Sequence, residues 1–255
     1  MTSAPGLNGA ATRGWGPARQ TLRALLARQP VTRLSAGVLE ALVSRVEFGC
    51  WRPGHEVTTS DEEPAGVRVV VGGVVKIVCH GTRGGAVTVQ LVGPGGLVHL
   101  ADVPADTVCR VRAVAHTPAL VGLLPAGAWR DVACHLRVDE TLRLADGAWQ
   151  TLSRRLYEKC ALLAQPLRAR VLQELHTLAR DFGTPHPAGV CIDLPLSHSD
   201  LASLVGAARA NVTRAVVALR AEGLLAPIPG RLVLATAAGQ PSAPDARSAA
   251  MRASS

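Results

Sequence analysis

The sequence predicts an α+β fold in which a β-rich domain and a C-terminal helical domain are joined by one long helix. Short apolar runs divided by glycine turns fill the middle of the chain, an apolar stripe at helical spacing follows, and two short helices with a sharp turn lie near the C-terminus. The chain has 255 residues, of which 48% are apolar, so two compact domains with real cores are expected.

The charge of the chain is strongly positive. Its 27 basic residues exceed its 19 acidic residues and give a formal net charge of +8. Such an excess favours a polyanionic partner without deciding between DNA, RNA and an anionic membrane. Only Lys76 and Lys159 are lysines, and the rest of the basic residues are arginines. No apolar run is long enough to span a bilayer and no secretory signal opens the chain, so a cytoplasmic protein without a membrane partner is expected.

The six cysteines are scattered singly along the chain. They stand at positions 50, 79, 109, 134, 160 and 191, with no CxxC pair and no Cys/His pattern of zinc ligands. We therefore expect reduced thiols that mostly fill cores, and no metal site.

Residues 1–33 form a basic N-terminal extension. Its first 17 residues are rich in glycine, alanine, serine and proline, and five arginines precede the first acidic residue, Glu40. An arginine-rich start without acidic residues is compatible with a transit peptide, but this composition favours a flexible, partly disordered basic arm. Residues 237–255 are expected to be a disordered tail.

Residues 34–135 are expected to form a β-roll. A short helix begins at Ser35, and strands are predicted within 67–78, around a Gly72-Gly73 turn, and at 86–92, 107–115 and 119–124. Turn signals recur about every 8 to 12 residues, a spacing typical of a barrel or roll.

Residues 136–165 are expected to be one long helix, from about 138 to 164. Five large apolar residues recur along it at heptad-like spacing: Leu142, Trp149, Leu152, Leu156 and Leu163. Such a stripe is either a core face or the seam of a coiled-coil dimer. Because the helix joins two domains and lies outside both, we favour the dimer seam, although Gly147 and Lys159 interrupt the repeat.

Residues 166–236 are expected to form a second domain, with a helix at 167–179 and a loop at 183–189 before its main motif. Ser197 followed by Asp200 is a capping box that starts a short helix. Gly206 ends this helix where the backbone needs a positive φ, and a second helix restarts within 207–210.

The spacing of three small or apolar residues identifies this pair of helices. Ala202 permits a close crossing, Gly206 makes the turn, and Val212 fills the shared core, as in a helix-turn-helix. A two-helix hairpin with solvated arginines is the alternative. The Pro229-Gly230 turn and the strand that follows predict the wing of a winged helix, which favours the first interpretation.

The start of the second helix carries the candidate DNA contacts. Its outward positions are Arg209, Ala210, Asn211, Thr213 and Arg214. These positions of a recognition helix reach base edges and phosphates in a major groove. Double-stranded DNA is therefore the expected partner.

The order of short helix, β-roll, long helix and winged helix-turn-helix resembles the catabolite-activator (CRP/FNR) family of transcription regulators. The resemblance covers about residues 34–236 and is strongest at 196–225. It implies a β-roll of the cyclic-nucleotide-binding type that senses an effector, a homodimer paired along the long helix, a palindromic DNA site, and RNA polymerase as a further partner.

The same resemblance assigns individual DNA contacts. Arg209 and Arg214 would read bases, and Ser197, Ser199 and Asn211 would lie near phosphates. The family often has an acidic residue after the first of these arginines, where this chain has Ala210. The base preference at that position is therefore open.

The effector pocket departs from the cyclic AMP pattern of the family. Members that bind cyclic AMP hold its ribose with a Gly-Glu pair and its phosphate with an Arg-Ser pair. At the matching positions this chain has His99-Leu100 and Thr107-Val108. Without the arginine and the carboxylate, burial of a cyclic phosphate is unfavourable, so cyclic AMP is not expected to bind.

A haem-binding sensor is the alternative that the pocket leaves open. His99 lies near the place where haem-sensing relatives supply an axial ligand, and His80, His116 and Cys79 are expected on neighbouring strands. Histidine at a strand end is also common without any metal. An iron-sulfur cluster is disfavoured because no cysteine precedes Cys50.

Catalysis is not expected. The chain lacks the G-x-S-x-G, HExxH and P-loop motifs, and the glycines at 93–96 fit a tight turn. The rival interpretation is a non-enzymatic protein-interaction module. An arginine-bearing helix without carboxylates or aromatic anchors suits phosphates better than a protein surface.

Overall fold

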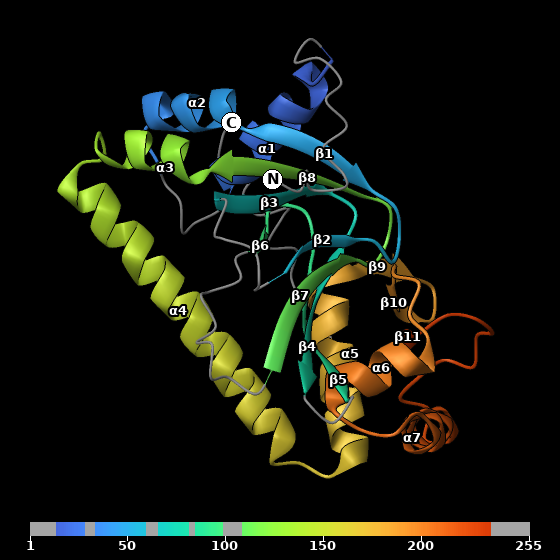
Figure 1. Ribbon diagram of the computed structural model, residues 1–255. Helices are drawn as coiled ribbons and strands as arrows, with labels where there is room; N and C mark the ends of the chain where they lie inside the picture. The colour runs from blue at the N-terminus through green and yellow to red at the C-terminus, as the bar shows by residue number, and fades with distance from the viewer. Residues whose placement is uncertain (1–13, 29–33, 60–65, 82–84, 99–108, 236–255) are drawn as a thin grey trace, which may run out of the picture.

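A computed structural model describes residues 14–28, 34–59, 66–81, 85–98 and 109–235 (Figure 1). The helices are α1 (Gly16–Arg28), α2 (Ala36–Arg45), α3 (Ala126–Ala133), α4 (Val138–Leu163), α5 (Leu167–Phe182), α6 (His198–Val205) and α7 (Arg209–Ala221). The strands are β1 (Glu47–Trp51), β2 (Glu56–Thr59), β3 (Gly66–Gly72), β4 (Val75–Gly81), β5 (Ala86–Val92), β6 (Leu97–Val98), β7 (Cys109–Ala115), β8 (Ala119–Pro125), β9 (Gly183–His186), β10 (Gly189–Ile192) and β11 (Val233–Ala235).

The β-roll consists of two antiparallel four-stranded sheets. Their strand orders are β1-β8-β3-β6 and β2-β7-β4-β5, and a core of small apolar residues from both sheets fills the space between them. Along β3 the side chains alternate: Val70 faces this core, whereas Val69 and Val71 face the helices outside. At the turn after β3, Gly73 has φ 72°, and a Cβ there would lie 2.0 Å from the backbone oxygen of Pro118. The predicted Gly72-Gly73 turn is thus confirmed.

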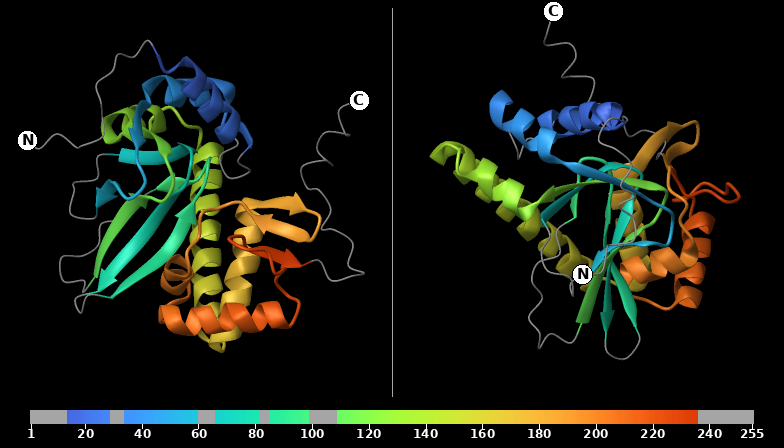
Figure 2. Two further views of the ribbon diagram at one scale, coloured as in Figure 1. Left: turned by 90° about the vertical axis from the view of Figure 1, so that its right-hand side faces the viewer. Right: turned by 45° about the horizontal axis from the view of Figure 1, so that its top comes forward.

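Helices α1, α2 and α3 cover the outer face of the first sheet (Figures 1 and 2). In α1, Ala18 and Leu22 are buried in a cluster shared with α2 and β3. The ring of Trp15 stacks on Phe48 at 5.6 Å, and the guanidinium of Arg19 lies 5.4 Å from the same ring. The prediction of a flexible basic arm is therefore wrong for residues 14–28. The apolar face of this segment finds a partner surface that its composition does not reveal.

Helix α4 runs from the helices above the β-roll to the C-terminal domain (Figure 1). Its first turn is anchored by Glu140, a buried carboxylate that accepts hydrogen bonds from the backbone amides of Ser35 at 2.9 Å and Arg137 at 3.1 Å. These two hydrogen bonds hold the pKa of Glu140 below its ordinary value, and the bond from Arg137 has the larger effect. The helix has the predicted bounds to within one residue.

The C-terminal domain packs α5, α6 and α7 with the three-stranded sheet β11-β10-β9. The segment predicted as a loop at 183–189 is instead the hairpin of β9 and β10, with Gly189 paired to His186. The wing is present: β11 pairs with β10, and Leu225 forms a bridge to Leu234 across the Pro229-Gly230 turn.

The β-roll and the C-terminal domain share one apolar core. Val74 and Leu91 of the β-roll belong to the same buried cluster as residues of α5, α6 and α7. The two regions predicted as separate domains are therefore in direct contact, and Figure 2 shows their arrangement from two directions.

Candidate nucleic-acid interface

The start of α6 is fixed by the predicted capping box. The amide of Asp200 donates to Ser197 Oγ at 3.1 Å, and the amide of Ser197 donates to Asp200 Oδ2 at 3.0 Å. The hydroxyl of Ser197 also donates to Asp200 Oδ2 at 2.6 Å. The side chain of Ser197 is therefore hydrogen-bonded within the chain while the residue stays exposed, and its place near a phosphate remains a prediction. Ser199, two residues further along the chain, is exposed.

The turn between α6 and α7 depends on Gly206. Its φ of 64° and ψ of 50° place it in the left-handed region, where a side chain is strained. The amide of Ala207 then donates to the backbone oxygen of Ala202 at 3.0 Å, which closes the turn. The roles predicted for Ala202, Gly206 and Val212 are therefore confirmed, since Ala202 and Val212 are both buried in the shared core.

Helix α7 separates an apolar face from a polar one. Val212, Val216 and Leu219 are fully buried. The predicted contact residues Arg209, Ala210, Asn211 and Arg214 are exposed on the other face, near the start of the helix. No acidic residue lies in α7. The positive charge of this face is therefore not neutralised by the helix itself.

Two polar residues of this surface are held by neighbours. Thr213 is only partly exposed, and its hydroxyl lies 2.9 Å from Nδ1 of His198 and 3.0 Å from the backbone oxygen of Arg209. The guanidinium of Arg214 donates to Asn211 Oδ1 at 2.5 Å. His198 was not among the residues predicted from sequence. The only sequence signal that could have identified His198 is its position in the first turn of α6, on the side that faces α7.

A cluster of titratable groups lies where α6 meets the β-roll. Burial raises the pKa of Asp200, but the hydrogen bonds from Ser197 and the nearby His116 and Lys76 outweigh it, so the pKa lies below its ordinary value. Burial lowers the pKa of His116, although Asp200 acts in the opposite direction. The Nε2 atom of His116 is buried without a hydrogen-bond partner.

The opposite end of α6 is held by two cations. Lys159 Nζ of α4 donates to the backbone oxygen of Leu204 at 3.3 Å and lies 3.4 Å from Oε2 of Glu174. Arg170 Nη1 of α5 donates to the backbone oxygen of Val205 at 3.1 Å. Burial raises the pKa of Glu174, and Lys159 offsets part of this effect. Positive charge at a helix C-terminus is stabilising because it complements the helix dipole.

The five residues of the predicted dimer seam are all exposed. Leu142, Trp149, Leu152, Leu156 and Leu163 have between 59% and 69% of their surface accessible. Lys159, which interrupts the heptad repeat, instead turns toward α5 and α6. A single chain thus leaves a long apolar stripe on α4 uncovered.

The predicted effector residues His99, Leu100, Thr107 and Val108 lie outside the described residues. Of their proposed neighbours, Cys79 and His80 lie on β4 and His116 follows β7. In the described ranges, no three histidine, cysteine or acidic side chains come together as a metal site. In the same ranges, no helix has the length and apolar character needed to cross a membrane.

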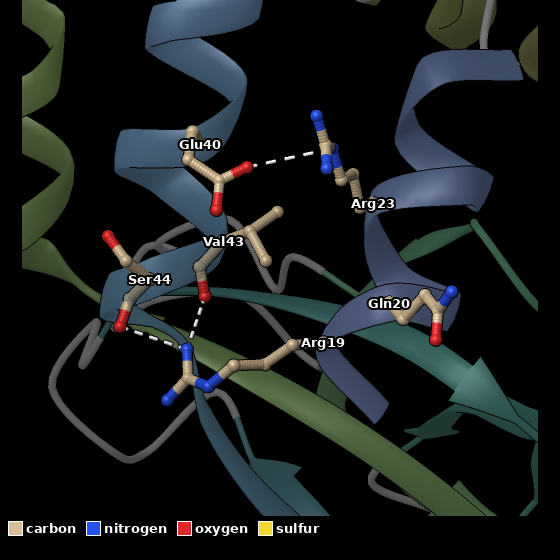
Figure 3. Close-up of a pocket in the computed structure, with 6 residues that line it drawn as sticks. All are labelled: Arg19, Gln20, Arg23, Glu40, Val43 and Ser44. Carbon is tan, nitrogen blue, oxygen red and sulfur yellow. Dashed lines mark hydrogen bonds and ion pairs between the residues drawn. The ribbon is translucent and has the colours of Figure 1, made fainter. Parts of the chain in front are cut away.

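A cavity of about 540 Å³ lies between α1 and α2 (Figure 3). It is lined by Arg19, Gln20, Arg23, Glu40, Val43 and Ser44. Its charged groups are already paired: Arg23 Nε lies 3.5 Å from Glu40 Oε2, and Arg19 Nη1 donates to the backbone oxygens of Val43 and Ser44. These contacts dock α1 on the last turn of α2. We therefore assign the cavity to helix packing.

Comparison with known proteins gives the same picture as the geometry. Residues 169–238 match the family of Crp-like helix-turn-helix domains. A global nitrogen regulator of Synechococcus elongatus is 36% identical over 91 residues, which are 34% of this chain and 41% of that relative. The chain thus spans less than half the length of this curated relative.

Two solved structures have the same fold. The c-di-GMP responsive global regulator CLP of Xanthomonas campestris is similar with a TM-score of 0.63 and 23% identity, over 80% of this chain and all of that one. A transcriptional regulator of the CRP/FNR family from Thermus thermophilus has a TM-score of 0.57 and 24% identity, over 74% of this chain and 94% of that one. The chain therefore has the fold of the CRP/FNR transcription regulators and carries a Crp-like helix-turn-helix domain, as its sequence predicts.

Proposed function

We propose that this protein is a transcription regulator that binds double-stranded DNA as a homodimer at a palindromic site. The observation that carries the proposal is the exposed face of α7, where Arg209, Asn211 and Arg214 stand at the start of a helix without acidic residues. A helix of this kind enters the major groove, where arginine can contact guanine with two hydrogen bonds and phosphates line both edges.

The exposed stripe of α4 supports the homodimer. Its heptad spacing is complementary to a second copy of itself, and pairing would bury both stripes around a two-fold axis. The two recognition helices would then address half-sites about 34 Å apart, one turn of the duplex. A two-fold protein requires a two-fold related DNA sequence.

The β-roll takes the role of sensor in this proposal. Cyclic AMP is not its effector in this proposal, because Leu100 stands where a carboxylate would be needed, and Thr107 and Val108 stand where an arginine and a serine would be needed. The family resemblance adds RNA polymerase as a partner. The sequence adds a cytoplasmic location and a function without catalysis to the proposal. Haem bound through His99 is the alternative for the sensor.

Selection of bound DNA from a random duplex pool tests the proposal. The expected result is a two-fold related sequence, together with a dimeric mass by analytical ultracentrifugation at micromolar concentration. A pool that stays random, or a monomer under these conditions, contradicts the proposal. An absorption spectrum of the purified protein without a Soret band would contradict the haem alternative.

A further inference from the structure

The only two lysines of the chain both contact α6, the first helix of the helix-turn-helix. Lys76 comes from β4 of the β-roll and Lys159 from α4, and they lie 83 positions apart in a chain that otherwise uses arginine. They contact opposite ends of the helix: Lys76 reaches Asp200 in its first turn, and Lys159 reaches Leu204 in its last.

The contact at the N-terminal end joins α6 to the β-roll. Lys76 Nζ lies 3.7 Å from Asp200 Oδ1, with both side chains about three-quarters buried. Next to this pair, the amide and the hydroxyl of Thr88 on β5 each lie 2.8 Å from Ser203 Oγ. Thr88 is buried. The polar contacts therefore run along one side of α6 and are partly shielded from water, which makes their loss more costly than that of fully exposed pairs.

The contact at the C-terminal end joins α6 to α4. Lys159 Nζ bridges the buried carboxylate of Glu174 on α5 and the free backbone oxygen of Leu204. A lysine suits this place because its compact ammonium group carries three donors on a flexible stem, whereas the planar fork of arginine prefers one bidentate partner. One side chain thus links three helices.

Neither lysine lies on the exposed face of α7. Both point into contacts within the chain, about a third or less of each side chain being accessible. We infer that Lys76 and Lys159 are positioning residues that fix the orientation of the helix-turn-helix relative to the β-roll and the long helix. The expected effect of these lysines on DNA binding rests on the proposed function. Their contacts with α6 do not depend on DNA.

The consequence concerns specific binding more than binding in general. Two recognition helices can engage two half-sites together only if each is held in one orientation, whereas attraction to phosphates tolerates a looser arrangement. Loss of either lysine contact is therefore expected to lower the affinity for the selected site more than the affinity for a scrambled duplex.

The test uses three full-length variants. Lys76→Met and Lys159→Met keep the length and apolar stem of the side chain and remove its charge. Arg154→Met is the matched control, because Arg154 is exposed on α4 five residues before Lys159 and its loss removes the same charge. Where Lys159→Met does not fold by circular dichroism, Lys159→Gln retains a donor of shorter reach and takes its place.

The first measurement needs no DNA. The amide of Thr88 lies on β5 at the sheet edge and donates to Ser203, so its hydrogen exchange reports whether α6 is docked. Both lysine variants are expected to accelerate this exchange about fivefold relative to the control, the effect of losing one partly buried polar contact. Unchanged exchange in both variants overturns the inference.

The second measurement is the affinity for the selected duplex and for a scrambled duplex at several salt concentrations. The expected result is a loss of about tenfold for the selected duplex only, with the slope of log K against log salt unchanged. A slope reduced by about 0.9 per lost contact would mean that the lysines bind phosphates, and it would overturn the positioning role. If no duplex is selected, the proposed function fails while the exchange experiment still decides the inference.

Discussion

Thr213 of α7 and His198 of α6 are joined by a hydrogen bond of 2.9 Å between Oγ1 and Nδ1. The same hydroxyl lies 3.0 Å from the backbone oxygen of Arg209. A threonine hydroxyl has a single hydrogen, so when it is donated to Arg209, Nδ1 of His198 must carry the proton. The pair therefore links the two helices of the helix-turn-helix directly beside the exposed arginines.

Replacing Thr213 by valine removes this link and keeps the shape of the side chain. Thr213→Val is expected to lower the free energy of unfolding by about 0.5 to 1.5 kcal/mol, since one partly buried hydrogen bond is lost. Thermal denaturation measures the change. Thr141→Val is the control, because Thr141 is exposed and makes the same bond to the residue four positions before it. Equal effects of the two variants would deny the cross-helix bond any role.

Arg209→Ala is expected to reduce affinity for the selected site by about 1 to 3 kcal/mol and to relax the base preference at one position of each half-site. Asn211→Ala is expected to weaken binding to all sequences about equally, as loss of a phosphate contact does. A panel of operators with single base changes measures both. Arg130→Ala, an exposed arginine on α3, controls for charge. Uniform weakening by Arg209→Ala would show that its role is misassigned.

Leu152→Glu is expected to abolish dimerisation, because two unpaired carboxylates would be buried in the seam of α4. Tyr157→Glu is the control: Tyr157 is exposed on the same helix but stands outside the stripe. Sedimentation equilibrium gives the mass, and circular dichroism checks that the β-roll stays folded. A dimeric Leu152→Glu variant would move the interface elsewhere.

Hydrogen bonds from backbone amides lower the pKa of Glu140. This shift gives the stability of the fold a defined pH dependence. A carboxyl whose pKa is lower in the folded state stabilises the fold above its unfolded value, and this contribution is lost as the pH falls through the folded value. The free energy of unfolding should therefore drop below about pH 4.5 more steeply in the parent than in Glu140→Gln. Urea titrations between about pH 3 and pH 7 compare the two slopes. Parallel curves would contradict the assignment.

Cyclic AMP is expected to show no binding at millimolar concentration. Losing the ionic partner of a buried phosphate removes a large share of the affinity of a small ligand. Isothermal calorimetry, and operator binding with and without the nucleotide, measure this. Saturable micromolar binding would mean that other residues hold the phosphate, with Arg110 and Arg112 of β7 as the first to replace.

The sequence predicts best where the signal is local. Strand β5 has the predicted bounds, and the capping box at Ser197 and the turn at Gly206 appear where expected. In each case the residues that set the structure lie within about one turn or one strand of each other. The exposed face of α7 follows from the same local periodicity.

The sequence predicts poorly where distant segments decide. Helix α1 is stabilised by burying Ala18 and Leu22 against α2 and β3, and its own arginine-rich pattern gives no hint of that surface. The contact of Lys76 with Asp200 spans more than a hundred residues and has no local signature. The hairpin of β9 and β10 contains two prolines, which are typical of loops.

The core shared by the two domains changes how a substitution in the β-roll should be classified. Val74 and Leu91 belong to the β-roll, yet their side chains pack among those of α5, α6 and α7. Truncating Leu91 would leave a void beneath the helix-turn-helix and act as a core mutation of the DNA-binding half. A domain boundary drawn on the sequence is therefore not a boundary of folding stability in this chain.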